Sequence, residues 1–155
     1  MNSENKEEIK FYHSHKSYYE FANFYLGKPI NFPSINGYEN LQGLWKTAEH
    51  LFQASKFASD KDVVEQFRQL ETPKKAFQLG RELSKSWSQD RRRKWNGNWK
   101  GDGTTSEKIK LMRLIVEYKF KGDIIWKIYF YRLELNKLSR TLKTIMLEKM
   151  LTEKI

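Results

Sequence analysis

The pattern of apolar and polar positions predicts a mainly helical chain. Five segments repeat apolar side chains every three or four residues, the spacing that places them on one face of an α-helix. These segments are residues 47–60, 60–70, 72–83, 106–116 and 135–150. The stretch just before the last one, residues 124–133, is rich in β-branched and aromatic residues and is also compatible with a strand.

Four of these segments begin with a side chain that can accept a hydrogen bond from the first free amides of a helix. The predicted cap residues are Thr47, Asp60, Thr72 and Ser106. Pro73 follows Thr72, and proline suits the first helical position because its fixed φ is helical and its missing amide would have no partner there. The chain therefore marks where each of these four helices starts.

Other segments lack this helical period. Ile9, Phe11 and His13 alternate with other residues, as in a short N-terminal strand. Residues 26–43 hold two glycines and two prolines before Gly43 itself, and predict a long connection with room for one hairpin. Residues 84–106 combine three tryptophans, a run of four cations and several glycines, and we predict a long loop there.

The length of 155 residues fits one domain, so we predict a single compact, mainly α domain over residues 1–155 with a short N-terminal β element. The absence of cysteine excludes a disulfide framework, a thiol nucleophile and a cysteine-based zinc site. His13 and His15 supply two ligands at most, so we expect no metal.

The N-terminus lacks the apolar core of a signal peptide, and residues 124–131 are too few to cross a membrane. We expect a cytoplasmic or nuclear protein that is neither secreted nor bound to a membrane.

The positive charge is unevenly distributed along the chain. The formal net charge is +10, yet residues 1–80 hold ten Lys/Arg and ten Asp/Glu, whereas residues 81–155 hold nineteen and nine. Such an excess favours attraction to the phosphates of a nucleic acid or a nucleotide. A basic surface that is merely well solvated would have the same composition, and both interpretations stay open.

Three polar residues share one line of the first predicted helix. At about 100° of rotation per residue, the side chains of Glu49, Gln53 and Lys56, here called the polar stripe, fall within about 60° of one another. Phe52 and Phe57 border the stripe. It faces solvent, or it meets a wet pocket or internal partners, because burying these groups unpaired would be costly. Spacing alone does not decide between these alternatives.

Four sequence blocks carry a resemblance to a known family. They are KFYHSHKSYYEFANFYLGKPI, LWKTAEHLFQASKF, KKAFQLGREL and KLMRLIVEYKF. In this order they resemble the motif blocks of the NADAR superfamily (NAD- and ADP-ribose-associated, also called YbiA-like). The resemblance implies a mainly helical N-glycosidase that hydrolyses the bond between a ribose and a nitrogen base, and we expect it to use no cofactor. The implied substrates are guanine bases in nucleic acid that carry ADP-ribose, or ribosylamino-pyrimidine intermediates of riboflavin synthesis.

The resemblance also assigns site residues. The family's motif positions fall on Glu20, Phe21, Asn23, Phe24, Glu49, Gln53, Lys56, Gly80, Arg81 and Met112. We predict that Glu49 and Lys56 are catalytic and that the others, Gly80 apart, bind the ligand.

The chemistry of these side chains fits the implied reaction. The Glu49 carboxylate can stabilise positive charge on the sugar or activate the attacking water. Lys56 can hold a hydroxyl or phosphate, or its amine can attack the anomeric carbon and form a Schiff base. Arg81 offers a bidentate clamp for a pyrophosphate, and Asn23 suits ribose hydroxyls. Phe21 and Phe24 suit a stacked base, with a place in the core as the alternative for each and the favoured one for Phe21.

The last part of the chain departs from the family pattern. The family usually ends with an Asp, a Trp-Gly pair and Asn-x-Leu-Gly, whereas here Lys127 follows Trp126 and Ser139 replaces the glycine. We therefore place the family-like core at about residues 10–120 and a divergent helical tail at residues 121–155. If the usual ending closes the pocket, an ADP-ribose-binding module with impaired catalysis is the alternative.

A basic cluster lies within the predicted loop. Arg91, Arg92, Arg93 and Lys94 precede Trp95, and cations beside aromatic rings often hold single-stranded nucleic acid. We expect a nucleic-acid contact here, with a disordered basic loop or a nuclear-targeting patch as alternatives.

Overall fold

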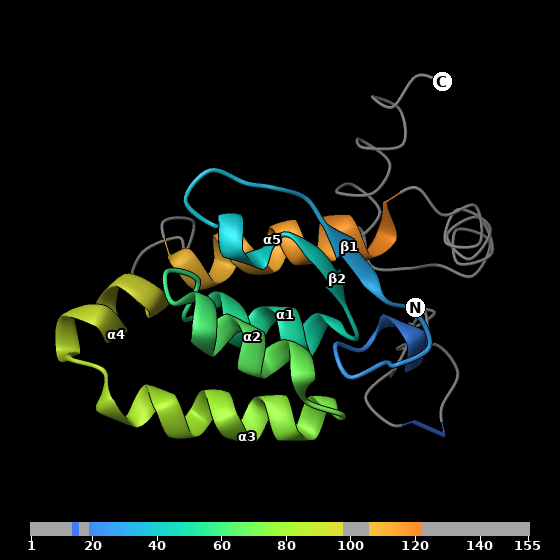
Figure 1. Ribbon diagram of the computed structural model, residues 1–155, viewed down its shortest axis with the longest axis horizontal. Coiled ribbons are helices and arrows are strands. Elements are labelled where there is room, and N and C mark those ends of the chain that lie inside the picture. The colour runs from blue at the N-terminus through green and yellow to red at the C-terminus, as the bar shows by residue number, and fades with distance from the viewer. Residues whose placement is uncertain (1–13, 16–18, 98–105, 122–155) are drawn as a thin grey trace, which may run out of the picture. The chain divides into compact units, whose positions relative to one another are not determined.

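The computed structural model describes residues 14–15, 19–97 and 106–121, all within one compact unit of residues 11–121 (Figure 1). Its elements are β1 (Ile30–Phe32), β2 (Gly43–Trp45), α1 (Ala48–Ser55), α2 (Lys61–Gln69), α3 (Pro73–Leu83), α4 (Gln89–Asn96) and α5 (Glu107–Phe120). The predicted mainly α fold with a small β element is confirmed. The strand expected at residues 9–13 and the helix expected at 135–150 lie outside the described residues, as does the 124–133 stretch, so a single domain over the whole chain stays a prediction.

Helix α1 is the element around which the others pack. It lies among α2, α3, α5 and β2 and contacts each of them (Figure 1). Its apolar side chains Ala48, Leu51 and Ala54 are buried. The predicted cap is confirmed, because Thr47 Oγ1 accepts the backbone amide hydrogen of His50. The helix ends at Ser55, earlier than predicted. The amide of Lys56 donates to the carbonyl of Gln53, three residues back, so the last turn tightens and does not continue as an α-helix.

The other three predicted caps are confirmed as well. The side chains of Asp60, Thr72 and Ser106 each accept the amide hydrogen of the residue three positions on. The helices they start place apolar side chains against α1, and these join one core with residues of both strands. The largest fully buried members of this core are Phe32, Leu41, Trp45, Leu51, Val64, Phe67 and Ile115. No helix in the described ranges is long and apolar enough to cross a membrane.

The β element is a two-stranded antiparallel sheet within the predicted connection. Strands β1 and β2 pair with Ile30 opposite Trp45 and Phe32 opposite Gly43. The side chains of Ile30, Phe32 and Trp45 are buried, so one face of the ribbon packs on the core. Gly43 has a φ of 113°, a conformation that favours glycine, at the start of β2. The hairpin that the connection had room for is therefore present.

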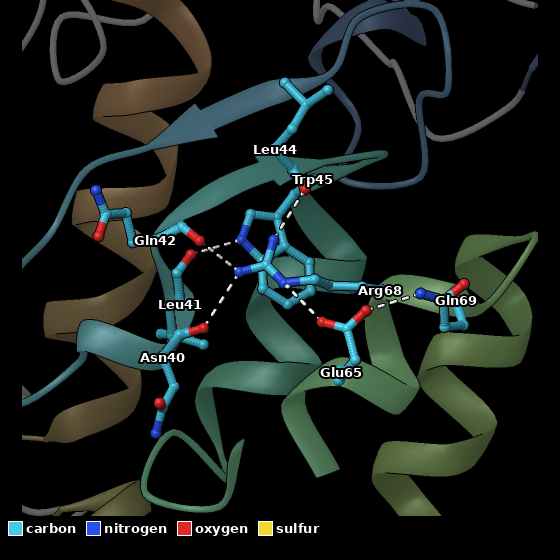
Figure 2. A network of polar contacts seen from close by, with 8 residues as sticks. All are labelled: Asn40, Leu41, Gln42, Leu44, Trp45, Glu65, Arg68 and Gln69. Atoms are coloured by element: carbon cyan, nitrogen blue, oxygen red, sulfur yellow. Dashed lines mark hydrogen bonds and ion pairs between the residues drawn. The ribbon is translucent and has the colours of Figure 1, made fainter. Parts of the chain in front are cut away.

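One arginine joins α2 to the sheet region (Figure 2). The Arg68 guanidinium lies 4.0 Å from the centre of the Trp45 ring. It also donates hydrogen bonds to the backbone carbonyls of Asn40, Gln42 and Leu44, at 3.2, 2.6 and 2.9 Å. A planar guanidinium can make these bonds while its face stacks on an indole, which an ammonium cannot. Arg68 therefore fixes the path of the chain that leads into α1.

The long loop predicted at residues 84–106 is wrong over Gln89–Asn96, which forms α4. Of the residues of this helix, Trp95 is the one that is buried, so the helix needs no repeating line of apolar side chains and the sequence shows none. Helix α4 is held at its ends, by one buried ring and by the Arg91 side chain, which pairs with Glu107 on α5. Ser88 caps its start, Gly97 follows its last turn with a φ of 67°, and Trp95 packs on the Phe52 ring at 5.6 Å.

Candidate active site

The first two residues of the polar stripe are buried and bonded to each other. Glu49 is 5% exposed and Gln53 is 2% exposed, so this part of the stripe does not face solvent. Gln53 Nε2 donates a 2.6 Å hydrogen bond to Glu49 Oε1. Burial raises the pKa of the Glu49 carboxyl, against the opposing effects of the Gln53 hydrogen bond and the positive charge of Lys56. Glu49 is therefore an oriented carboxyl whose charged form is held in place at some cost.

Gly80 makes room for this arrangement on the neighbouring helix. A Cβ at position 80 would lie 2.0 Å from Gln53 Oε1 and 2.9 Å from its Cδ. Gln53 Oε1 is buried against α3 and has no hydrogen-bond partner among the described residues. The glycine in the third sequence block thus acts through packing: it leaves room between α1 and α3 for the Gln53 amide, whose nitrogen donates to Glu49.

Lys56 completes the stripe just after α1. It is half-buried, with its Nζ 5.8 Å from the centre of the Phe52 ring. Burial lowers the pKa of its ammonium, the Glu49 carboxylate raises it, and Lys108 on α5 lowers it further. A lysine with a lowered pKa has more neutral amine at physiological pH, which is the form that acts as a nucleophile or base. Carboxyl and amine thus influence each other across the stripe.

A segment far from α1 in sequence lies beside Glu49. We call residues 19–25 the N-terminal segment; it starts with a short 3-10 helix, Tyr19–Phe21. The backbone amide of Glu49 donates to the Asn23 carbonyl at 3.0 Å. Asn23 Nδ2 makes a weak 3.9 Å contact to Met112 Sδ on α5. Three of the predicted site residues, Glu49, Asn23 and Met112, are therefore brought together.

Two other predicted residues of this segment, Glu20 and Phe21, lie close to the end of α5. The Phe21 ring is 5.8 Å from the Phe120 ring, which favours the core role left open for this aromatic. Phe24 is 36% exposed, as a side chain available for stacking would be. The Glu20 carboxylate attracts the ammonium of Lys119.

Lys119 is a residue that the sequence reasoning missed. It is 7% exposed, and its Nζ donates a 2.7 Å hydrogen bond to the carbonyl of Ala22 in the N-terminal segment. Burial lowers its pKa to about 8, with the Glu20 carboxylate acting in the other direction. A signal was present: Lys119 continues, at steps of four residues, the buried line of Leu111 and Ile115.

Arg81 is not brought to this group. It is exposed on α3 and makes no hydrogen bond or ion pair with any residue that the structure describes. It follows Gly80 directly, and one helical step turns its side chain about 100° away from the residue that packs on Gln53. The predicted pyrophosphate clamp therefore stays a prediction without support from the position of this side chain.

The basic cluster is used partly inside the fold. Arg91 forms a 2.6 Å ion pair with Glu107, donates to the carbonyl of Lys56 at 3.0 Å and stacks 4.5 Å from the Trp87 ring. Trp95 is 4% exposed. Arg92 is exposed, yet its guanidinium donates hydrogen bonds to the carbonyls of Ser84, Lys85 and Trp87. Arg93 and Lys94 are exposed as well, and the expected nucleic-acid contact of this cluster stays a prediction.

His50 lies next to Glu49 but points into the core. It is fully buried, with Nδ1 2.8 Å from Thr47 Oγ1 and Nε2 3.2 Å from the carbonyl of Leu70. A carbonyl can only accept, so Nε2 carries the proton and Nδ1 accepts from the Thr47 hydroxyl. Burial lowers the His50 pKa, which keeps the ring neutral. In the described part of the chain no three His, Asp or Glu side chains are grouped so that they could hold a metal ion.

Comparison with known proteins identifies the family of this chain. A family model described as NADAR domain matches residues 10–153, beyond the end of the family-like core placed at residue 120. The chain is 32% identical over 113 residues to the N-glycosidase YbiA of Shigella flexneri serotype 5b (strain 8401) and, to the same extent, to that of Shigella flexneri. The matched region is 73% of this chain and 56% of each relative, so the chain spans little more than half of their length. No solved structure matches it significantly.

Proposed function

This chain belongs to the NADAR domain family, and on that premise we propose that it is an N-glycosidase that removes ADP-ribose from ADP-ribosylated guanine in nucleic acid. The observation that carries the proposal is the buried pair of Glu49 and Gln53 with the half-buried Lys56 beside it. The N-glycosidase names of the Shigella relatives support the reaction class. The substrate rests on the excess of positive charge in residues 81–155, which suits a polyanion.

In the proposed reaction the bond between the anomeric carbon and the base nitrogen breaks. The base keeps the electron pair and takes up a proton, while the oxygen of a water molecule forms the new bond to carbon. Positive charge develops on the sugar as the base leaves, and the Glu49 carboxylate stabilises it or accepts the proton of the attacking water. Gln53 holds that carboxylate in one orientation through the 2.6 Å hydrogen bond.

Lys56 has two possible parts in this scheme. As an ammonium it would bind a ribose hydroxyl or a phosphate oxygen. As a neutral amine it would form a bond to the anomeric carbon while the bond to the base breaks, and the base would leave with the electron pair and a proton. Opening of the ribose ring would then give a Schiff base, and its hydrolysis by water would free the lysine. The lowered pKa of Lys56 supports the second part, and the attraction between Lys56 and Glu49 supports a site in which both act on one sugar.

Two substrates tested in parallel examine the proposal. We expect the purified protein to release ADP-ribose from an oligonucleotide with ADP-ribosylated guanine, and to act more slowly on a ribosylamino-pyrimidine phosphate. Faster turnover of the pyrimidine would support the N-glycosidase activity but contradict ADP-ribosylated guanine as the substrate. Calorimetry with ADP-ribose runs beside the assay: binding with no turnover of either substrate would contradict the enzyme and identify a binding module.

A further inference from the structure

Two backbone carbonyls of the N-terminal segment accept hydrogen bonds from the rest of the fold. Its Asn23 carbonyl accepts from the backbone of Glu49, and its Ala22 carbonyl accepts from Lys119 Nζ. Within the segment, the amide of Tyr25 donates to that same Ala22 carbonyl at 3.2 Å. The Ala22 carbonyl is therefore the point where the turn of the segment and the end of α5 meet, one residue before the contact with Glu49.

Packing does not explain a lysine at this position. Leu111 and Ile115 occupy the preceding buried positions of the same line on α5, and an apolar side chain at 119 would extend that line without desolvating a charge. Lys119 instead brings an ammonium to 7% exposure, where its hydrogen bond to Ala22 and the attraction of the Glu20 carboxylate offset part of the cost. Because a buried ammonium costs stability, Lys119 is better explained by a function of its hydrogen bond: the Ala22 carbonyl that it holds lies next to Asn23.

We propose that Lys119 is a positioning residue of the active site: its hydrogen bond to the Ala22 carbonyl fixes the N-terminal segment so that Asn23 lies beside Glu49. The role in catalysis rests on the proposed function, whereas the tether itself does not. Lys119 acts through the segment and does not touch the reacting atoms. Its loss should therefore weaken ligand binding more than it slows the chemical step.

The tether is tested first by hydrogen exchange, which needs no activity. In Lys119→Met the side chain keeps its length and loses the donor. We expect the amides of Tyr25 and Glu49, which donate into the segment's turn and its Asn23 carbonyl, to exchange at least about tenfold faster, in line with the loss of a charge-assisted hydrogen bond. Lys110→Met removes an exposed lysine from the same helix and should leave both amides unchanged. Unchanged exchange in Lys119→Met would overturn the proposal.

Steady-state kinetics then test the effect on the site. We expect Lys119→Met to raise KM about tenfold and to change kcat by less than about threefold, because Glu49 and Lys56 keep their places. Lys119→Arg, which restores a charged donor, should return KM to within about threefold of the wild-type value. An arginine variant as impaired as the methionine variant, or a fall in kcat without a change in KM, would overturn the positioning role.

Folding of the variants is checked by thermal unfolding. Removing a desolvated ammonium should not lower the melting temperature, so we expect Lys119→Met to stay folded; if it unfolds, Lys119→Gln is measured in the same way. A wild-type protein inert on both substrates, together with faster exchange in the methionine variant, would contradict the proposed function and leave the tether standing. Normal turnover by the wild-type protein, together with unchanged exchange in Lys119→Met, would support the proposed function and contradict the tether.

Discussion

The position of Glu49 in its helix and its burial have opposite effects on the ionised carboxylate. It occupies the first turn of α1, where the helix dipole favours a negative charge, yet it is 5% exposed and its pKa is raised by burial. A carboxyl with a raised pKa in the folded protein supports folding most when protonated. Its contribution is fully present below the unfolded-state pKa, near 4.5, and is lost as the pH rises through the folded pKa.

This sign gives a prediction for the stability of Glu49→Gln. Glutamine is neutral at every pH and can still accept the Gln53 hydrogen bond, so the variant should melt at a higher temperature than the wild type at pH 7. The difference should disappear below about pH 4, where the wild-type carboxyl is protonated. Thermal unfolding between pH 3.5 and 8 measures it, with Glu82→Gln, exposed on α3, as the matched control. A lower melting temperature for Glu49→Gln at pH 7 would contradict the account.

The contact between Gly80 and Gln53 leads to a second prediction. Gly80→Ala should lower the free energy of unfolding by about 1–2 kcal/mol, because the new methyl displaces the Gln53 amide. In a Gln53→Ala background the same change should cost less, because only the Cβ of residue 53, 3.2 Å from the new methyl, still crowds it, and alanine is the better helix former. Urea unfolding of the four proteins gives the coupling. Equal effects of Gly80→Ala in both backgrounds would show that the two residues are independent.

At single positions the sequence identifies candidate site residues, but it does not show whether their side chains are buried or exposed. The line of Glu49, Gln53 and Lys56 follows from helical rotation, but whether it is buried depends on α3 and on Gly80, which rotation does not reveal. Lys119 was missed because a lysine is usually read as a surface residue. The converse holds for Arg81, whose chemistry suits a clamp while its helical position turns it toward solvent.

Among the elements, helix starts were predicted well and the elements that depend on tertiary contacts were not. Side-chain caps are local, so Thr47, Asp60, Thr72 and Ser106 can be found in the sequence alone. Helix α4 has no apolar stripe and depends on Trp95 packing against another helix, so its residues were expected to form a loop.

The Arg68 network gives the prediction at the scale of elements. Arg68→Lys keeps the charge but cannot reach three carbonyls while stacking on Trp45, so we expect the free energy of unfolding to fall by about 1–3 kcal/mol. The control is Arg113→Lys at an exposed position of α5, which should change stability by less than about 0.5 kcal/mol. Urea denaturation compares the two. Similar effects in both variants would mean that the bonds in Figure 2 do not hold α2 to the sheet region.

For the whole molecule, the basic excess divides into buried and exposed parts. Arg91, Arg92 and Lys119 bond to internal partners, whereas Arg93 and Lys94 of α4 and the cations in the early part of α5 face solvent. The exposed cations of α5 include Lys108, which also influences Lys56. Positive charge beside the polar stripe is what a phosphate-bearing substrate would meet, and it supports a polyanionic substrate over a neutral one.

The most direct measurement of the central claim compares wild-type protein with Glu49→Gln on an oligonucleotide that carries ADP-ribosylated guanine. Glu82→Gln serves as the control for loss of an acidic charge. We expect wild type and the control to release ADP-ribose at similar rates, and Glu49→Gln to be slower by at least about 100-fold while binding ADP-ribose within a few fold of wild type. Turnover by Glu49→Gln at the wild-type rate would contradict the assignment of the reaction to this site.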